Sequence, residues 1–261
     1  MSVPESISPE HGGEQQPSEV PEETVSAVED ANPGLIEKAL RRNTERLPVK
    51  VEDPEVEPSG QLTLVRDPYD PRSEKIRALR TELLMLSDAA SVNLAIVSSA
   101  AGEGRSLLAA ELALAFGQLG RRTLLVDADM RNPTQHSLFQ TSNKAGLAQC
   151  IAGRTPQMYR IKRLTSTSLI TAGTATSNPL ELLSDQRFER LMERWRKQFE
   201  FIILDTPPIN RFADGLTVAA LAGRVLVVSR AEATRFKDLK ETLRRLSLTR
   251  SQILGAVINS F

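Results

Sequence analysis

Apolar runs alternate with helical patterns from about residue 73 onward. Six runs predict strands at 94–98, 123–127, 168–172, 201–205, 224–229 and 253–258. The segments between them repeat apolar residues at helical spacing and predict helices at 73–87, 106–119, 179–198, 212–221 and 236–246. Strands that are apolar throughout are typical of a parallel sheet covered by helices on both faces. The pattern therefore predicts a doubly wound α/β domain at residues 72–261.

Three segments of different composition precede this domain. The first 32 residues carry eight acidic and no basic side chains, so the rest of this chain of zero net charge is positive. Such a segment buries too little apolar surface to fold, which predicts a disordered acidic arm at 1–31. A short amphipathic helix is expected at 32–47, either as a docking helix or as a solvated one. Five prolines then predict an extended linker at 48–71.

The strand at 94–98 runs into a glycine-containing turn and then a helix, which is the form of a phosphate-binding loop. Glycines permit close backbone approach to a polyphosphate, and the helix N-terminus adds a favourable dipole. The alternative is an ordinary strand-to-helix turn. Two positions depart from the usual loop: Ser99 replaces its first glycine and Arg105 replaces its lysine. The candidate nucleotide-binding residues are Ala101, Gly102, Glu103, Gly104, Arg105, Ser106 and Leu107.

Carboxylates end two of the other predicted strands. Asp127 and Asp129 follow the strand at 123–127, and Asp205 ends the strand at 201–205. The carboxyl ends of parallel strands face one crevice, so these acids and the loop are expected to converge. Mg²⁺ prefers a few protein oxygens and several waters, which the hydroxyl of Ser106 and these carboxylates can supply. Taken singly, each aspartate could instead be a helix cap or turn former.

The motifs resemble, in order, those of the cytoplasmic bacterial tyrosine kinases of exopolysaccharide and capsule assembly. The resemblance extends from about Ser73 to the C-terminus and is carried by the loop, by 125–133, by 178–183 and by the Asp-Thr-Pro-Pro sequence at 205–208. It implies transfer of the γ-phosphoryl group of ATP to a tyrosine hydroxyl, with Mg²⁺ as cofactor. The branch that it most resembles has arginine at the loop-lysine position and a membrane-spanning chain-length regulator on a separate chain.

The resemblance also implies roles for individual residues. Ser106, Asp127 and Asp205 would hold Mg²⁺, and Arg105 would contact the phosphates. Asp127 would orient or deprotonate the acceptor hydroxyl, with Asp129 in support. By resemblance to related P-loop ATPases, Asn259, near the end of the last predicted strand, would meet the adenine.

Glu74, Arg77 and Arg80 lie three residues apart and share one helical face. This spacing is similar to the family's oligomerisation signature, and it predicts a homo-oligomer formed through these residues. The alternative is an ion pair on a solvated helix. A membrane-bound regulator is the expected protein partner, and no nucleic-acid partner is expected.

Two observations leave the function open between three hypotheses. Only Tyr69 and Tyr159 are present in this sequence, whereas kinases of this family usually carry a tyrosine-rich tail. Arginine is also not equivalent to lysine at a phosphate site. A catalytically weak ATP-binding scaffold is therefore an alternative to the kinase. A partitioning-type ATPase is a second, although Ala100 stands where those proteins usually have a signature lysine. Since no apolar stretch is long enough to span a membrane and no signal peptide is evident, the sequence predicts a cytoplasmic protein recruited to the membrane by its partner.

Overall fold

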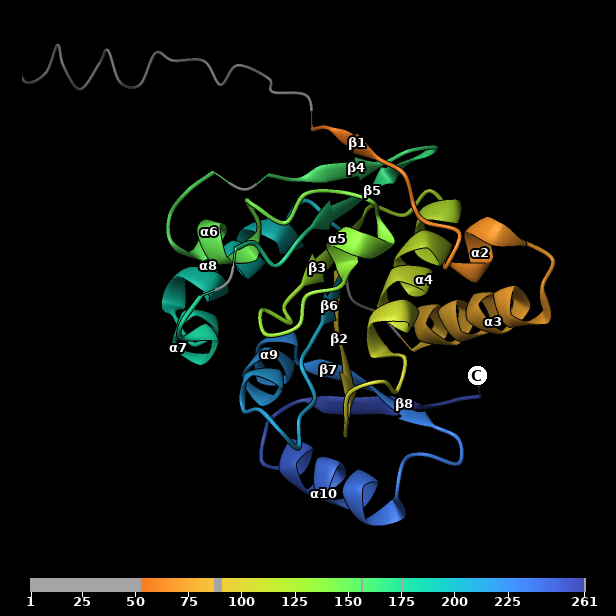
Figure 1. The fold of residues 1–261 in the computed structure, drawn as a ribbon, viewed down its shortest axis with the longest axis vertical. Helices are drawn as coiled ribbons and strands as arrows, with labels where there is room; N and C mark the ends of the chain where they lie inside the picture. The colour runs from red at the N-terminus through yellow and green to blue at the C-terminus, as the bar shows by residue number, and fades with distance from the viewer. Residues whose placement is uncertain (1–52, 87–90, 156, 175, 261) are drawn as a thin grey trace, which may run out of the picture. The chain divides into compact units, whose positions relative to one another are not determined.

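The computed structural model describes residues 53–86, 91–155, 157–174 and 176–260. An eight-stranded sheet lies at its centre (Figure 1). Its strands are β1 (Glu55–Val56), β2 (Val92–Ser98), β3 (Thr123–Asp127), β4 (Tyr159–Ile161), β5 (Leu164–Ile170), β6 (Phe201–Asp205), β7 (Arg224–Arg230) and β8 (Gln252–Asn259). Their order across the sheet is β1-β4-β5-β3-β6-β2-β7-β8. All neighbouring strands pair in parallel except β4 and β5. The predicted α/β class is confirmed.

Helices lie between the strands and on both faces of the sheet. They are α2 (Thr63–Arg66), α3 (Pro71–Met85), α4 (Arg105–Gln118), α5 (Gln135–Leu138), α6 (Leu147–Ile151), α7 (Pro179–Leu183), α8 (Gln186–Arg196), α9 (Asp214–Ala222) and α10 (Phe236–Ser247). Alternate residues along each central strand enter different clusters: Leu94 and Ile96 join one with α3 and α4, whereas Ala95 and Val97 join another with α6, α8 and α9. Side chains alternate between the faces of a strand, so these clusters are the cores of the two faces.

The central strands explain why the acidic motifs meet. β6 lies between β2 and β3, and Asp127 stands directly opposite Asp205 in the β3–β6 register. In the pairing with β2, Asp205 stands opposite Ile96, two residues before Ser98 ends that strand. The phosphate loop and the strand-terminal acids therefore share one edge of the sheet.

The structure differs from the sequence pattern at the β1 edge. The pattern predicts only parallel strands, but β4 runs antiparallel to β5 because the two-residue turn Lys162–Arg163 joins them as a hairpin. Arg163 in this turn has a positive φ of 65°. Short hairpin connections can join only antiparallel strands.

The segment at 53–71 also differs from the extended linker expected there. It contributes β1 and α2, and its residues Leu62 and Leu64 are buried in the cluster beneath α4. Proline-rich composition did not prevent packing because its apolar residues reach the α4 face of the sheet. The predicted arm at 1–31, the predicted helix at 32–47 and residues 48–52 lie outside the described residues.

One predicted helix is two helices in the structure. The pattern at 179–198 gives α7 and α8 because Asp185 interrupts it, accepting a hydrogen bond from the backbone N–H of Arg187 at 2.8 Å. That contact is an N-terminal cap, and it starts α8 anew. None of the helices in the described residues is long and apolar enough to cross a membrane.

Candidate functional site

The loop between β2 and α4 has the backbone geometry of a phosphate cradle. Gly102 and Gly104 adopt positive φ angles of 78° and 90°, a region that other residues rarely enter. Gly104 is the N-cap of α4, so the loop ends where unpaired helix N–H groups begin. An anion in this loop would therefore meet both backbone donors and the positive end of the helix dipole.

Glu103 fastens this loop to the rest of the domain. Its carboxylate accepts hydrogen bonds from the backbone N–H of Ala100 at 2.9 Å and from the hydroxyl of Thr234. Its carbonyl accepts a hydrogen bond from the amide of Asn259 at 3.2 Å. Glu103 is 4% exposed. The side chain is therefore a structural anchor of the loop, with partners contributed by the segment after β7 and by β8.

A cavity of about 330 Å³, which we call the phosphate cavity, opens in front of the loop. It is lined by all seven residues predicted for the loop site and by Asp129, Asn132, Thr134, Pro208, Arg211 and Phe212. Of the three predicted aspartates, Asp129 is the one that lines this cavity. Asp127 and Asp205 lie behind it and are fully buried.

The guanidinium of Arg105 points inward, towards the strand ends. It donates to the hydroxyl of Ser98 at 2.6 Å, to the carboxylate of Asp129 at 3.0 Å and to that of Asp205 at 3.4 Å. Only 8% of the side chain is exposed. Arg105 therefore lies at the phosphate cavity, as its position in the loop predicts, but its charge is matched by two buried carboxylates.

Asp127 organises the loop that follows β3. Its two carboxylate oxygens accept hydrogen bonds from the backbone N–H groups of Asp129, Thr134 and Gln135, at 3.0–3.1 Å. Burial, followed by the nearby charge of Asp205, raises the pKa of Asp127 well above its usual range. Burial also raises the pKa of Asp205, against the opposing effect of Arg105. The pair is thus poised to attract a further cation or a proton.

The donor set suits Mg²⁺. Three carboxylates are buried at the strand ends, and the guanidinium of Arg105 pairs with two of them, which leaves an excess of negative charge that a hard divalent cation would offset. Gln135 donates its amide N–H to Asp205 at 2.8 Å and to the carbonyl of Ser106 at 2.9 Å, while its buried Oε1 has no hydrogen-bond partner. No group of three or more His, Cys, Asp or Glu side chains in the described residues forms a metal cage. Mg²⁺ needs no such cage, because waters and substrate phosphates usually complete its coordination.

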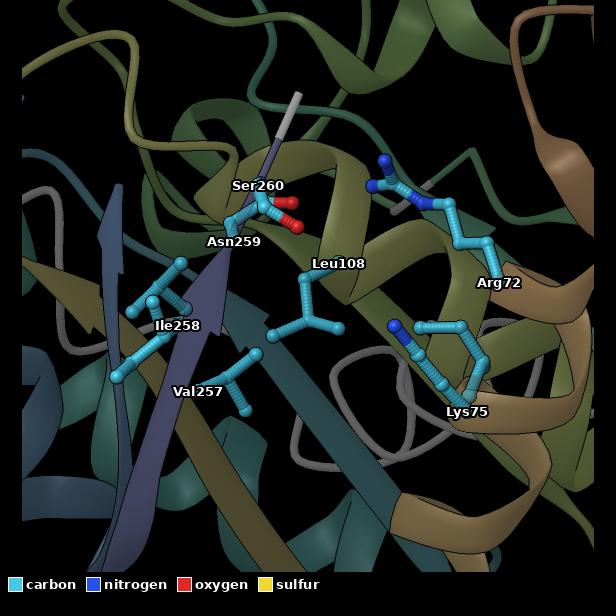
Figure 2. Close-up of a pocket in the computed structure, with 9 residues that line it drawn as sticks. Arg72, Lys75, Leu108, Val257, Ile258, Asn259 and Ser260 are labelled. Carbon is cyan, nitrogen blue, oxygen red and sulfur yellow. The ribbon is translucent and has the colours of Figure 1, made fainter. Parts of the chain in front are cut away.

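A second, smaller cavity of about 150 Å³ lies between α3, α4 and the end of β8 (Figure 2). Asn259 and Leu108 line it, and Figure 2 shows Arg72 and Lys75 extending from α3 towards the end of β8. Leu108 directly follows Leu107, a lining residue of the phosphate cavity, so both cavities border the first turn of α4. Asn259, the residue expected to contact the adenine, lines this second cavity.

The predicted oligomerisation residues lie on α3, and all three form hydrogen bonds within the chain. Arg77 donates to the carboxylate of Glu74 and to the carbonyl of Pro68, the latter at 2.8 Å. Arg80 donates to the carbonyl of Ala115 on α4 at 3.1 Å, and burial lowers its pKa. Glu74 is exposed and both arginines are half-buried.

Several residues of the site carry no sequence signal. Thr242 donates to the hydroxyl of Ser99 at 2.9 Å, which joins α10 to the start of the loop. Arg131 forms a two-point ion pair with Asp214, at 2.6 and 3.1 Å. Thr242 and Ser99 are 143 positions apart in the sequence, and Arg131 and Asp214 are 83 positions apart, so only the fold could reveal these contacts.

Comparison with known proteins places the chain in a family. A family model described as ParA: NUBPL iron-transfer P-loop NTPase matches residues 90–260. The chain is 33% identical over 197 residues to the tyrosine-protein kinase YwqD of Bacillus subtilis, covering 74% of this chain and 83% of that relative. The chain belongs to the bacterial tyrosine-kinase family of P-loop NTPases. The family resemblance of the sequence motifs is thereby confirmed.

Other relatives of this bacterial tyrosine-kinase family differ greatly in length. The tyrosine-protein kinase wzc of Salmonella typhimurium is 32% identical over 204 residues, which is 77% of this chain but only 28% of that relative. The crystal structure of the chimerical protein CapA2B2 matches with a TM-score of 0.73 and 31% identity, covering 79% of this chain and 92% of that one. The chain thus spans most of the shorter relatives and about a quarter of the longer ones.

Proposed function

We propose that the chain is an ATP-dependent protein tyrosine kinase that regulates exopolysaccharide chain length and export together with a membrane-spanning regulator. The observation that carries this proposal is the phosphate cavity. It is lined by Asp129 and by a loop in which two glycines have positive φ, and the buried Asp127 and Asp205 lie behind it. Phosphoryl transfer depends on positioning and on charge neutralisation, which the loop and the acids of this site would supply. The names of YwqD and wzc support the tyrosine acceptor.

The loop would hold the phosphates of ATP, and the second cavity would receive the base beside Asn259. Ser106, Asp127 and Asp205 would hold Mg²⁺ directly or through water. When bound, Mg²⁺ would neutralise the charge of the phosphates and fix their orientation. Arg105 already pairs with two carboxylates at the cavity, so it would orient these acids as well as contact the phosphates.

In the reaction, the tyrosine oxygen forms a bond to the γ-phosphorus while the bond from that phosphorus to the bridging oxygen of ADP breaks. The electron pair of the broken bond leaves on ADP, and the phenolic proton passes to a carboxylate. Asp129 reaches the cavity, and Asp127 supports it through the hydrogen bond from the N–H of Asp129. We therefore assign orientation and deprotonation of the acceptor to this pair of aspartates.

A protein partner would complete the assembly. The family branch that the sequence motifs resemble has a membrane-spanning regulator on a separate chain, and we propose such a chain as the partner here. That chain would recruit this one to the cytoplasmic face of the membrane. Glu74, Arg77 and Arg80 would join copies of this chain, with the exposed Glu74 offered to the neighbour.

The alternative is a regulatory scaffold that binds ATP without transferring phosphate. The inward position of Arg105, held by Asp129 and Asp205, favours it, because a loop cation bound to carboxylates is less able to follow a moving phosphoryl group. Incubation with γ-labelled ATP, Mg²⁺ and a tyrosine-containing acceptor peptide separates the two. Label on tyrosine is expected for the kinase. Label that remains on ATP despite tight binding would support the scaffold, and label released only as free phosphate would support an ATPase.

A further inference from the structure

A second arginine lines the phosphate cavity, and no sequence motif identified it. Arg211 belongs to the connection between β6 and α9, and with its neighbour Phe212 it faces the cavity in front of the loop. The residue is exposed. Among the described residues, no carboxylate forms an ion pair with it. Its positive charge is therefore available to an anion that enters the cavity.

Two other arginines near the cavity have their charges matched. Arg105 pairs with Asp129 and Asp205. Arg131 pairs with Asp214, whose carboxylate is 1% exposed. A polyphosphate approaching the loop would also meet the negative charge of Asp129 on the cavity wall. Arg211 is well suited to offset that charge.

The chain around Arg211 is held in place from three sides. The backbone N–H of Ile209 donates to the carbonyl of Ser98 at 3.0 Å, which ties the connection to the strand that leads into the loop. Asn210 donates to the carbonyl of Asp238 on α10 at 2.9 Å. The ring of Phe212 contacts two guanidinium groups, with centroid distances of 4.3 Å for Arg131 and 5.1 Å for Arg211. Arg211 is thus presented to the cavity by a fixed support.

The two cavities indicate which phosphate Arg211 would meet. Asn259 lines the cavity proposed for the base, whereas Arg211 lines the phosphate cavity, together with Asp129 and Asn132. A nucleotide with its base in the second cavity, beside Asn259, and its phosphates along the loop would therefore bring its last phosphate towards Arg211. A planar guanidinium can form two parallel hydrogen bonds to a phosphate group.

We infer that Arg211 binds the terminal phosphate of a nucleoside triphosphate held by the loop at 101–107. This assignment rests on the proposed use of ATP, but it concerns binding and is independent of whether phosphate reaches a tyrosine. Arg211 then supplies the triphosphate with a cation additional to Arg105. It makes the site selective for a triphosphate over a diphosphate.

Calorimetric titration of the full chain with ATP, ADP and adenosine, in the presence of Mg²⁺, tests this inference. Arg211→Ala is expected to weaken ATP binding by at least about tenfold, the usual effect of losing a charged hydrogen bond, with a much smaller effect on ADP. Adenosine affinity should not change. Arg211→Lys should recover part of the ATP affinity, because the charge survives without the planar pair of donors. Arg190→Ala, which removes an exposed arginine of α8 outside this cavity, is the matched control and should bind all three ligands as the wild type does.

Equal ATP affinity in wild type and Arg211→Ala would overturn the inference, as would equal losses for ATP and ADP or an absence of ATP binding by the wild type. Circular dichroism of each variant shows whether a loss of affinity follows from a loss of structure. Selective loss of ATP affinity in a chain that forms no phosphotyrosine would uphold this inference while contradicting the kinase proposal, so the two failures are distinguishable.

Discussion

Individual side chains at the strand ends determine what the site can do, and Arg105 is the most consequential of them. Its guanidinium joins Ser98, Asp129 and Asp205, three groups contributed by three different segments. The same arginine therefore contributes to folding and to the charge of the cavity. Substitutions at this position should affect stability as well as nucleotide binding.

Arg105→Ala should lower the free energy of unfolding by about 3–5 kcal/mol, since removing one partner of a buried ion pair leaves uncompensated charge. Urea denaturation in EDTA measures this effect without a divalent cation that could replace the guanidinium. The control is Arg121→Ala, which breaks a pair with Glu200 whose arginine is 49% exposed. That exposed pair should contribute much less. Equal effects of the two substitutions would contradict the buried role of Arg105.

Asp127, the last residue of β3, should contribute more to phosphoryl transfer than to nucleotide binding. Asp127→Asn should retain nucleotide binding but reduce phosphoryl transfer by about 10² to 10⁴, the usual contribution of orientation and proton transfer. Steady-state kinetics with labelled ATP measures the rate, and calorimetry measures the binding. Asp129→Asn, whose carboxylate lines the cavity, is the comparison. Unchanged turnover in Asp127→Asn would remove that residue from the mechanism and leave Asp129 as the acceptor-orienting group.

The sequence predicted which residue types would meet here, but not how they bond. Apolar strands that end in acids identified the edge of the sheet where Asp127 and Asp205 face each other. The inward turn of Arg105 depends on the positions of two carboxylates 24 and 100 residues away, which no local pattern encodes. Arg211 had no signal either, because its role depends on the cavity that Phe212 and the loop form around it.

At the scale of elements, a buried carboxylate on α4 binds the backbone of α2. Glu111 of α4 is fully buried and accepts hydrogen bonds from the backbone N–H of Thr63 and from that of Leu64 at 3.1 Å. The segment before α3 is thereby attached to the helix that begins at the phosphate loop. The pattern of prolines at 48–71 gave no indication of this attachment, because Glu111 lies 47 residues away in the sequence.

Glu111→Ala should destabilise the domain by about 1–3 kcal/mol, because two buried N–H groups lose their acceptor. Burial raises the pKa of Glu111 above its usual value, so the folded state binds the proton more tightly than the unfolded state does. The stability that this proton binding contributes is therefore present below the unfolded pKa and is lost as the pH rises through the folded pKa.

Chemical denaturation at several pH values checks both statements. The free energy of unfolding of the wild type should fall relative to that of Glu111→Gln as the pH rises through this window, because glutamine does not ionise. A difference between the two that is independent of pH would show that Glu111 does not titrate with a raised pKa.

Apolar spacing predicted the helices but not where they begin. The prediction for α3 starts at residue 73, two residues after its observed start at Pro71, where the carboxylate of Asp70 accepts a hydrogen bond from the N–H of Arg72 at 2.8 Å. The break between α7 and α8 was missed although Asp185 makes the same kind of cap, because apolar spacing continues across it. Strands of two or three residues, such as β1 and β4, carry too little pattern to be recognised at all.

For the whole molecule, the central question about assembly is whether α3 joins copies of the chain. Replacing Glu74, Arg77 and Arg80 together by alanine should shift the mass measured by light scattering towards the monomer. Since Arg80 also bonds to Ala115 within the chain, Glu74→Ala alone is the cleaner variant, and it removes an exposed carboxylate. Circular dichroism should be unchanged in both. A wild type that is monomeric with ATP and partner present would favour the solvated-helix interpretation.

The two tyrosines of this chain differ in how far their side chains are exposed to solvent. Tyr69 is 90% exposed and lies just before α3, whereas Tyr159 is 4% exposed and donates its hydroxyl to the carbonyl of Ser142 at 3.2 Å. A hydroxyl buried in this way cannot reach the phosphate cavity of another copy without unfolding of β4. If the chain phosphorylates itself, Tyr69 is therefore the expected acceptor.

Mapping of phosphotyrosine tests the central claim most directly. The full chain is incubated with ATP, Mg²⁺ and the cytoplasmic segment of its membrane partner, and modified residues are located by mass spectrometry, with Tyr69→Phe and Asp205→Asn as controls. The account predicts phosphate on Tyr69 or on a tyrosine of the partner, none on Tyr159, and none anywhere with Asp205→Asn. Bound ATP without any phosphotyrosine, or phosphate on Tyr159 alone, would contradict it.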